Sequence, residues 1–173
     1  MPSSTSPAAP SPLPYHDTKP VGAADFYAAI HATFRFIERR FGMEGLRRYW
    51  VDLGRDYYAP VSLRWKQQGL PGVAEYWRAF FAAEPAAEVT VHATENEVAV
   101  EVRKCPAIHY LRQHQREIVP HFCQHCYFVS QAAGETAGVE VRVTGGNGAC
   151  MQRFAKRGSF VGSQDLSCIT IAS

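Results

Sequence analysis

The 173-residue sequence lacks a charge excess of either sign, a long hydrophobic run and any internal repeat. Eighteen Lys and Arg residues stand against sixteen Asp and Glu, so the net charge is only +2. Nucleic-acid-binding domains usually show a strong basic bias. A membrane-spanning helix needs roughly 20 apolar residues in succession, and no run approaches that length. We therefore expect neither a nucleic-acid partner nor a membrane partner.

The start of the sequence lacks the basic segment followed by an apolar segment that marks a secretory signal peptide. Residues 1–20 instead hold six of the eleven prolines, among Ser, Thr and Ala. Such a composition buries too little apolar surface to offset chain entropy. We predict a disordered tail over residues 1–20, a single domain over residues 21–173, and a cytoplasmic location.

Two hydrophobic periods alternate along the chain and predict its elements. A 3.6-residue period indicates helices, which Gly42, Pro60 and Gly138 are expected to end, and strict alternation indicates strands. The predicted helices span 23–41, 44–58, 71–83, 107–115 and 119–137; the predicted strands span 88–93, 97–103, 139–144, 149–156 and, at an edge, 167–171. This order predicts an α+β fold, in which N-terminal helices pack with an antiparallel sheet of two hairpins and a connecting helix.

Four of the five cysteines lie between residues 105 and 150, and the fifth, Cys168, is expected to be a packing residue. In a reducing compartment, clustered cysteines more often bind metal or catalyse a reaction than form disulfides. Cys123 and Cys126 are three residues apart, so they share one face of the predicted helix. Cys105 ends a predicted strand, and Cys150 follows the glycine-rich turn at residues 145–148. The sequence therefore predicts one site lined by four thiols.

Two kinds of chemistry fit this cluster. The positive end of a helix lowers a thiol pKa, and a nearby histidine can act as a base. On that hypothesis the clustered cysteines form a catalytic site, with His121 or His125 as the base. Thiolates are also the ligands that Zn²⁺ prefers. On the second hypothesis Zn²⁺ or another transition metal is bound by Cys105, Cys123, Cys126 and Cys150. No nucleotide cofactor is expected.

Two further residues are candidates for binding a substrate. Arg153 lies near Cys150 in the sequence, and its planar guanidinium could hold a carboxylate. His109 follows Cys105 by four residues. Both are expected beside the cysteines.

The strand ending in Cys105-Pro106, the helix with Cys123 and the turn leading to Cys150-Met-Gln-Arg-Phe154 resemble the L-2-amino-thiazoline-4-carboxylic acid hydrolase family. More distantly, the order of helix, Gly138, strand, turn and Cys150 is similar to the small-molecule-binding domain named after 4-vinyl reductase. The first resemblance implies a hydrolase that opens a cyclic amidine with water and yields N-carbamoyl-cysteine. Cys105, Cys123 and Cys150 match the family's cysteine positions, so the resemblance implies that they are the catalytic cysteines. Its substrate would be a small carboxylated heterocycle containing nitrogen and sulfur.

Two alternatives to an enzyme stay open at this stage. The more distant resemblance implies a binding or sensing domain that turns nothing over. A four-cysteine zinc site could also be purely structural and tie the helix to the sheet. Many members of the hydrolase family carry an acidic residue where this chain has Cys126, which strengthens the metal hypothesis.

Overall fold

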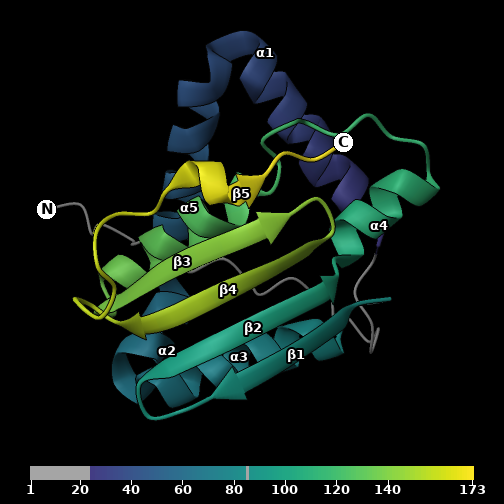
Figure 1. Cartoon of the computed structure of the whole chain (residues 1–173). Helices are drawn as coiled ribbons and strands as arrows, with labels where there is room; N and C mark the ends of the chain where they lie inside the picture. Colours follow the sequence, from purple (N-terminus) through teal and green to yellow (C-terminus); the bar gives the residue numbers. More distant parts are fainter. Residues whose placement is uncertain (1–23, 85) are drawn as a thin grey trace, which may run out of the picture.

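A bent 27-residue helix, α1 (Phe26–Asp52), opens the part of the chain that the computed structural model describes, which is residues 24–84 and 86–173. At Gly42 the backbone has φ 69° and ψ −177°, a conformation that costs glycine far less than other residues. The helix therefore divides there into two arms, which Figure 1 shows as a bent ribbon. The expected break at Gly42 is confirmed, whereas the predicted tail over residues 1–20 lies outside the described residues.

The segment after α1 contains a helix that was not predicted from the sequence. A π-helical turn, Leu53–Tyr57, leads into α2 (Ala59–Gln68) and then into α3 (Leu70–Ala82). Pro60 was expected to end a helix, but it lies in the first turn of α2. The first turn is the position where a missing backbone N–H costs nothing, so this proline begins a helix.

The five strands form one sheet in the order β1-β2-β4-β3-β5 (Figure 1). Both predicted hairpins are present: β1 (Glu88–Ala93) with β2 (Glu97–Lys104), and β3 (Val139–Gly146) with β4 (Ala149–Lys156). These four strands pair antiparallel, but β5 (Ile169–Thr170) runs parallel to β3. The α+β class is confirmed, and the sheet is mixed rather than purely antiparallel.

Helices cover one face of the sheet. Helix α3 contacts β1, β2 and β4, and α5 (Gln124–Glu135) contacts β3. In Figure 1 these helices lie behind the strands. The inward residues of β2 are Val98, Val100 and Val102, and all three are buried, as strict alternation requires. This layer forms the first of two hydrophobic cores.

The second core lies where α1, α4 (Pro106–Gln113) and α5 meet. Its large buried side chains include Phe34, Leu46 and Trp50 from the two arms of α1. Helix α5 begins at Gln124 and not at Val119 as predicted. The backbone N–H of Val119 donates to Nε2 of buried His31 at 2.9 Å, which fixes this segment in a turn before α5. No helix within the described residues is long and apolar enough to cross a membrane.

Candidate functional site

Three segments of the chain deliver the four cysteines to one region of the fold. Cys105 immediately precedes α4, Cys123 immediately precedes α5, Cys126 lies in the first turn of α5, and Cys150 is near the start of β4. Cys105 and Cys123 each pack against both cores. The backbone N–H of Cys105 also donates to the carbonyl of Gly148 at 2.8 Å, which ties the end of β2 to the β3–β4 turn.

The four thiols are close enough to influence one another electrostatically. A negative charge on Cys126 would raise the pKa of Cys105, Cys123 and Cys150. A charge on Cys105 would likewise raise the pKa of Cys123 and Cys150, and a charge on Cys123 would raise the pKa of Cys150. All four cysteines are free and partly buried, whereas Cys168 is free and exposed, so its expected role as a packing residue is wrong. The structure therefore brings the four together and leaves the fifth apart.

Burial decides the protonation state of these thiols. It raises the pKa of Cys105 to about 11 and the pKa values of Cys123 and Cys126 to about 12. Burial also raises the pKa of Cys150. Backbone N–H groups lower the pKa of Cys105 and Cys123 by a smaller amount. The expected net lowering at a helix start is therefore wrong, because desolvation of the thiolate outweighs the favourable dipole. Near pH 7 the thiols are neutral.

Hydrogen-bond donors already face two of the sulfur atoms. The backbone N–H of Asn147 donates to Sγ of Cys123 at 3.2 Å, and Nε2 of Gln152 lies 3.9 Å from Sγ of Cys150. The turn that supplies Asn147 needs glycine at position 146, where φ is 150°. A Cβ atom at Gly146 would lie 2.5 Å from the Thr170 carbonyl oxygen and 3.3 Å from Cβ of Cys123.

His125 and Cys126 form a thiol–imidazole pair. Nδ1 of His125 lies 2.6 Å from the carbonyl oxygen of Phe122. A carbonyl only accepts, so Nδ1 carries the proton and Nε2 has a free lone pair. Sγ of Cys126 lies 3.6 Å from Nε2 and 4.0 Å from Nδ1, so the sulfur is beside the ring and off the axis of the Nε2 lone pair. Burial lowers the pKa of His125, so its imidazole is neutral at pH 7. The rings of Phe34 and Phe122 pack against it with centroid separations of 5.5 and 4.9 Å.

The other two histidines of the sequence-based site are placed differently. Nδ1 of His121 lies 3.4 Å from Nε2 of Gln124, whose Oε1 accepts from Arg47 of α1 at 3.3 Å. His121 is thus tied to a polar group beside α1. His109 lies in α4 and is partly buried. Among the described residues no hydrogen bond joins the His109 side chain to a cysteine. Of the two candidate bases, the geometry favours His125.

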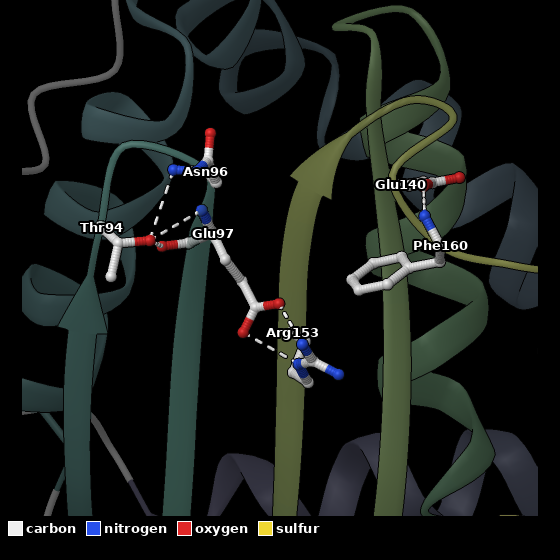
Figure 2. A network of polar contacts seen from close by, with 6 residues as sticks. All are labelled: Thr94, Asn96, Glu97, Glu140, Arg153 and Phe160. Carbon is white, nitrogen blue, oxygen red and sulfur yellow. Dashed lines mark hydrogen bonds and ion pairs between the residues drawn. The ribbon is translucent and has the colours of Figure 1, made fainter.

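Arg153 lies on the opposite face of the sheet from Cys150, so its expected position beside the cysteines is wrong. Side chains alternate along a strand, and a separation of three residues puts these two on opposite faces. Figure 2 shows the Arg153 guanidinium against the carboxylate of Glu97, with Nε 2.9 Å from Oε1 and Nη2 bonded to Oε2. The guanidinium also lies 5.3 Å from the centroid of the Phe160 ring. Its carboxylate-binding edge is therefore already occupied.

Three residues of the site were missed by the sequence reading. The hydroxyl of Tyr27 donates to Glu84, and charges on Cys105 and Cys126 help raise the pKa of Tyr27 after burial and this hydrogen bond. Tyr27 and Glu84 are 57 residues apart, and no local pattern indicates their contact. Gln152 is 3% exposed, and its Oε1 has no hydrogen-bond partner among the described residues. Strand alternation does place Gln152 on the same face as Cys150, but nothing in the sequence marks it as a site residue.

Neither the arrangement of metal-binding side chains nor a similarity to known proteins tests the hypotheses drawn from the sequence. Within the described ranges, no group of three or more His, Cys, Asp or Glu side chains is arranged to hold a metal ion. No protein-family model, curated protein or solved structure matches the chain significantly.

Proposed function

We propose that the protein is a hydrolase-like enzyme that opens a small heterocycle containing nitrogen and sulfur, with Cys126 as nucleophile and His125 as general base. One observation carries this proposal: Sγ of Cys126 lies beside the imidazole of His125, 3.6 Å from Nε2 and 4.0 Å from Nδ1, while Nδ1 is held by the Phe122 carbonyl. Proton transfer requires the Cys126 side chain to turn toward the Nε2 lone pair. A nucleophile, a base and a group that orients the base form the arrangement that activates side-chain nucleophiles. The resemblance to the thiazoline hydrolase family supports the choice of substrate class.

A neutral imidazole can act as a general base, but burial raises the pKa of the Cys126 thiol to about 12, so the proton must leave as the bond to carbon forms. As Sγ of Cys126 attacks the ring carbon between nitrogen and sulfur, its proton passes to Nε2 of His125. The bond between this carbon and the ring sulfur breaks, and the sulfur leaves as a thiol with that proton. Water then adds to the same carbon, the bond to Cys126 breaks, and a carbamoyl product leaves. One water is consumed, and Cys126 returns to its thiol form.

The neighbouring groups support this chemistry in two ways. Cys105 and Cys123 stay protonated near neutral pH because their pKa values are raised, so they place no negative charge beside the attacking sulfur. Gln152 offers a buried acceptor without a partner, next to Cys150. Five buried side-chain atoms lack a partner among the described residues, and this acceptor lies beside a cysteine of the cluster. The N–H of an amidine substrate would be a donor for it.

The test is turnover of 2-amino-2-thiazoline-4-carboxylate, with the product identified by mass. Cys126→Ser should lower kcat/KM by about 10³-fold or more, and His125→Gln by roughly 10²–10⁴-fold. Cys168→Ser is the matched control, because Cys168 is exposed and outside the cluster. Circular dichroism and melting curves check that the variants fold. No ring opening by the wild type, or a fully active Cys126→Ser variant, would refute the proposal.

A second candidate is a metal site of the four thiolates, which the clustering of the cysteines in the sequence and their electrostatic influence on one another support. As placed in the described residues, the side chains do not form a metal-binding arrangement. A tetrahedral Zn²⁺ site needs four Zn–S bonds of about 2.3 Å, so the sulfur atoms would have to close around the ion. Because the thiol pKa values are raised, binding would release protons and tighten steeply with pH. Elemental analysis and Zn²⁺ titration at several pH values test this.

Two further results separate the readings of such a metal site. Unfolding by a chelator would indicate a structural zinc site, whereas ligand binding without turnover would indicate a binding or sensing domain. If the reduced protein binds no Zn²⁺ at any pH, both the structural zinc site and a metal-binding sensing domain are excluded.

A further inference from the structure

The two edges of the sheet differ in how their outward backbone groups are bonded. At one edge, the side-chain amide of Gln164 bonds the N–H and the carbonyl of Val143 in β3 at 2.9 and 3.0 Å. Oε1 of Gln131 accepts from the N–H of Val141 at 2.9 Å, and β5 pairs with the end of the same strand. Native sheets usually cover an edge in some such way, because open backbone groups recruit another strand.

Strand β1 forms the opposite edge, beyond β2 in Figure 1, and its register shows which backbone groups point outward. The N–H of Thr94 donates to the carbonyl of Glu97 at 2.8 Å, so these opposed residues are a hydrogen-bonded pair. Hydrogen-bonded and non-hydrogen-bonded pairs alternate along an antiparallel ladder. In the same register Val89 and Val91 are therefore not hydrogen-bonded to β2, and their N–H and carbonyl groups point away from it.

One side chain within residues 24–84 and 86–173 bonds these outward groups. Nη2 of Arg78 lies 3.3 Å from the carbonyl oxygen of Val91, which agrees with the outward direction of this carbonyl. A carbonyl oxygen has two lone pairs, so it can accept a second hydrogen bond. No side chain or loop in that part of the chain bonds the N–H groups of Val89 and Val91. In contrast to β3, this edge is open.

An open groove of about 210 Å³ lies beside the edge, between β1 and α3. It is lined by Arg78, Phe81 and Ala82 of α3 and by Ala87, Val89 and Val91. Apart from the guanidinium of Arg78, the lining side chains are apolar. A strand added to β1 would bond the outward backbone groups and place every second side chain over this groove.

We infer that β1 is a self-association surface, through which two copies of the chain pair antiparallel around Thr90 and join their sheets into one. A two-fold axis at Thr90 places Val89 opposite Val91 of the second copy. Both residues have outward backbone groups, so they exchange two hydrogen bonds on each side of the axis. The inference is independent of the proposed reaction, because no residue of β1 belongs to the thiol cluster.

The strand is complementary to itself in this register, which favours a second copy over another partner. On the outer face, Thr90 meets Thr90, and Glu88 lies opposite His92 of the other copy, so the axis relates two carboxylate–imidazole pairs. The side chains of Glu88 and His92 are 62% and 63% exposed, and only loose contacts of 3.7 and 3.9 Å join them to Lys104 and Glu101. Shifting one strand by two residues would lose these pairs.

The groove side of the joined sheet is also self-complementary. The valines at positions 89 and 91 form cross-strand pairs of β-branched side chains, which are favourable in sheets. Because opposed residues point to the same face, the two grooves meet and their apolar linings are buried together. Shifting one strand by a single residue would set outward backbone groups against inward ones.

Sedimentation equilibrium of the reduced full chain tests the inference. The measured mass should rise from 19.3 kDa, the mass of one chain, toward twice that value between about 1 and about 100 μM. Val91→Pro removes an outward donor but no bond to β2, so the fold should survive. The variant should raise the Kd of the dimer by roughly tenfold to hundredfold, because each copy loses one interface hydrogen bond.

Thr90→Lys is the second variant, and it changes only the outer face of the strand. Two lysines would lie opposite each other at the axis, so the Kd should rise by about tenfold or more. Thr144→Lys is the matched control, because Thr144 is an exposed threonine on the covered edge strand β3. It should leave the Kd unchanged. Circular dichroism and melting curves check that each variant folds.

A disulfide cross-link tests the register. Thr90→Cys is made in a Cys168→Ser background, which removes the exposed native thiol. Opposed residues of a non-hydrogen-bonded pair have Cα atoms about 4.5 Å apart, which is within the range of a disulfide. Oxidised glutathione should join the two introduced thiols, which release two protons and two electrons as the reagent is reduced to two molecules of glutathione. Thr144→Cys in the same background should give no covalent dimer.

A wild type that stays monomeric over the whole concentration range would overturn the inference and leave an extended segment of another protein as the occupant of the edge. A dimer that neither Val91→Pro nor Thr90→Lys weakens would also overturn it, because the copies would then associate elsewhere. Failure of Thr90→Cys to cross-link a dimeric protein would overturn the pairing around Thr90.

Discussion

The two faces of β4 carry opposite kinds of chemistry on neighbouring residues. On the inner face, Cys150, Gln152 and Phe154 point toward the helices, and the last two are buried. On the outer face, the Arg153 guanidinium is half exposed and paired with Glu97 (Figure 2). Burial keeps the inner thiol neutral, whereas the outer group stays charged and is screened by water. Position on the pleat, rather than distance in the sequence, therefore decides which residues share a site.

The largest expected difference between the faces is in stability. Phe154 is fully buried and packs against Trp65 and Trp77, with ring centroids 5.8 and 5.7 Å apart. Phe154→Ala should lower the free energy of unfolding by about 3–5 kcal/mol, because it removes apolar burial and leaves a cavity. Arg153→Ala should lower it by less than about 1 kcal/mol. Urea unfolding measures both, and equal losses would contradict the assignment of the two faces.

The inner face should also weaken the protein at alkaline pH. Folding raises the thiol pKa values above the ordinary value of 9.0. Above pH 9 the unfolded chain therefore releases thiol protons that the folded chain retains, and stability falls as pH rises. Each thiol contributes a slope of up to about 1.4 kcal/mol per pH unit.

Urea unfolding of the reduced protein between pH 8 and pH 10 measures this slope. Cys126→Ala should flatten it, whereas Cys168→Ser should not. A slope that Cys126→Ala leaves unchanged would show that the cluster thiols are not desolvated.

The variant Gln152→Leu should affect stability and activity differently. The buried Oε1 of Gln152 lacks a partner, so this variant should leave the free energy of unfolding unchanged or raise it by up to about 1 kcal/mol. The same change should lower kcat/KM if the acceptor binds the amidine of the substrate. Melting and turnover are measured on the same preparation. A destabilised but fully active variant would show that Gln152 is only structural.

The smallest expected effect lies on the outer face. A double-mutant cycle on Glu97 and Arg153 should give a coupling energy of about 1 kcal/mol or less, which decreases as salt is added. Neither single variant should change turnover, because the pair lies on the face opposite the thiols. A loss of activity in Arg153→Gln would restore the residue to the substrate site.

Elements set by short-range pattern could be predicted from the sequence. The alternation over residues 88–103 gave the first hairpin, and Gly42 gave the bend in α1, because each depends on a few neighbouring residues. Helix α2 was missed because Pro60 was assigned to the end of a helix rather than to a first turn. The parallel pairing of β5 with β3 depends on the path of residues 157–168, for which the sequence carries no periodic signal.

In the site, too, features that depend on neighbouring residues could be predicted, whereas features that depend on long-range packing could not. The grouping of the four cysteines followed from their places at element ends, but their raised pKa values depend on burial that a sequence does not show. Arg153 was misplaced because proximity in sequence was taken as proximity in space. Arg112 contacts Asn147, which is 35 residues away in the sequence. Glu84 contacts Tyr27, which is 57 residues away. Both contacts are too distant in the sequence for a local pattern to indicate them.

The most direct test of the reactive Cys126–His125 pair is single-turnover mass spectrometry of the wild type with 2-amino-2-thiazoline-4-carboxylate. We expect a transient ring-opened adduct in the peptide that contains Cys126, formed more slowly in His125→Gln and absent in Cys126→Ser. An adduct on another cysteine, or product formation by Cys126→Ser at the wild-type rate, would contradict it.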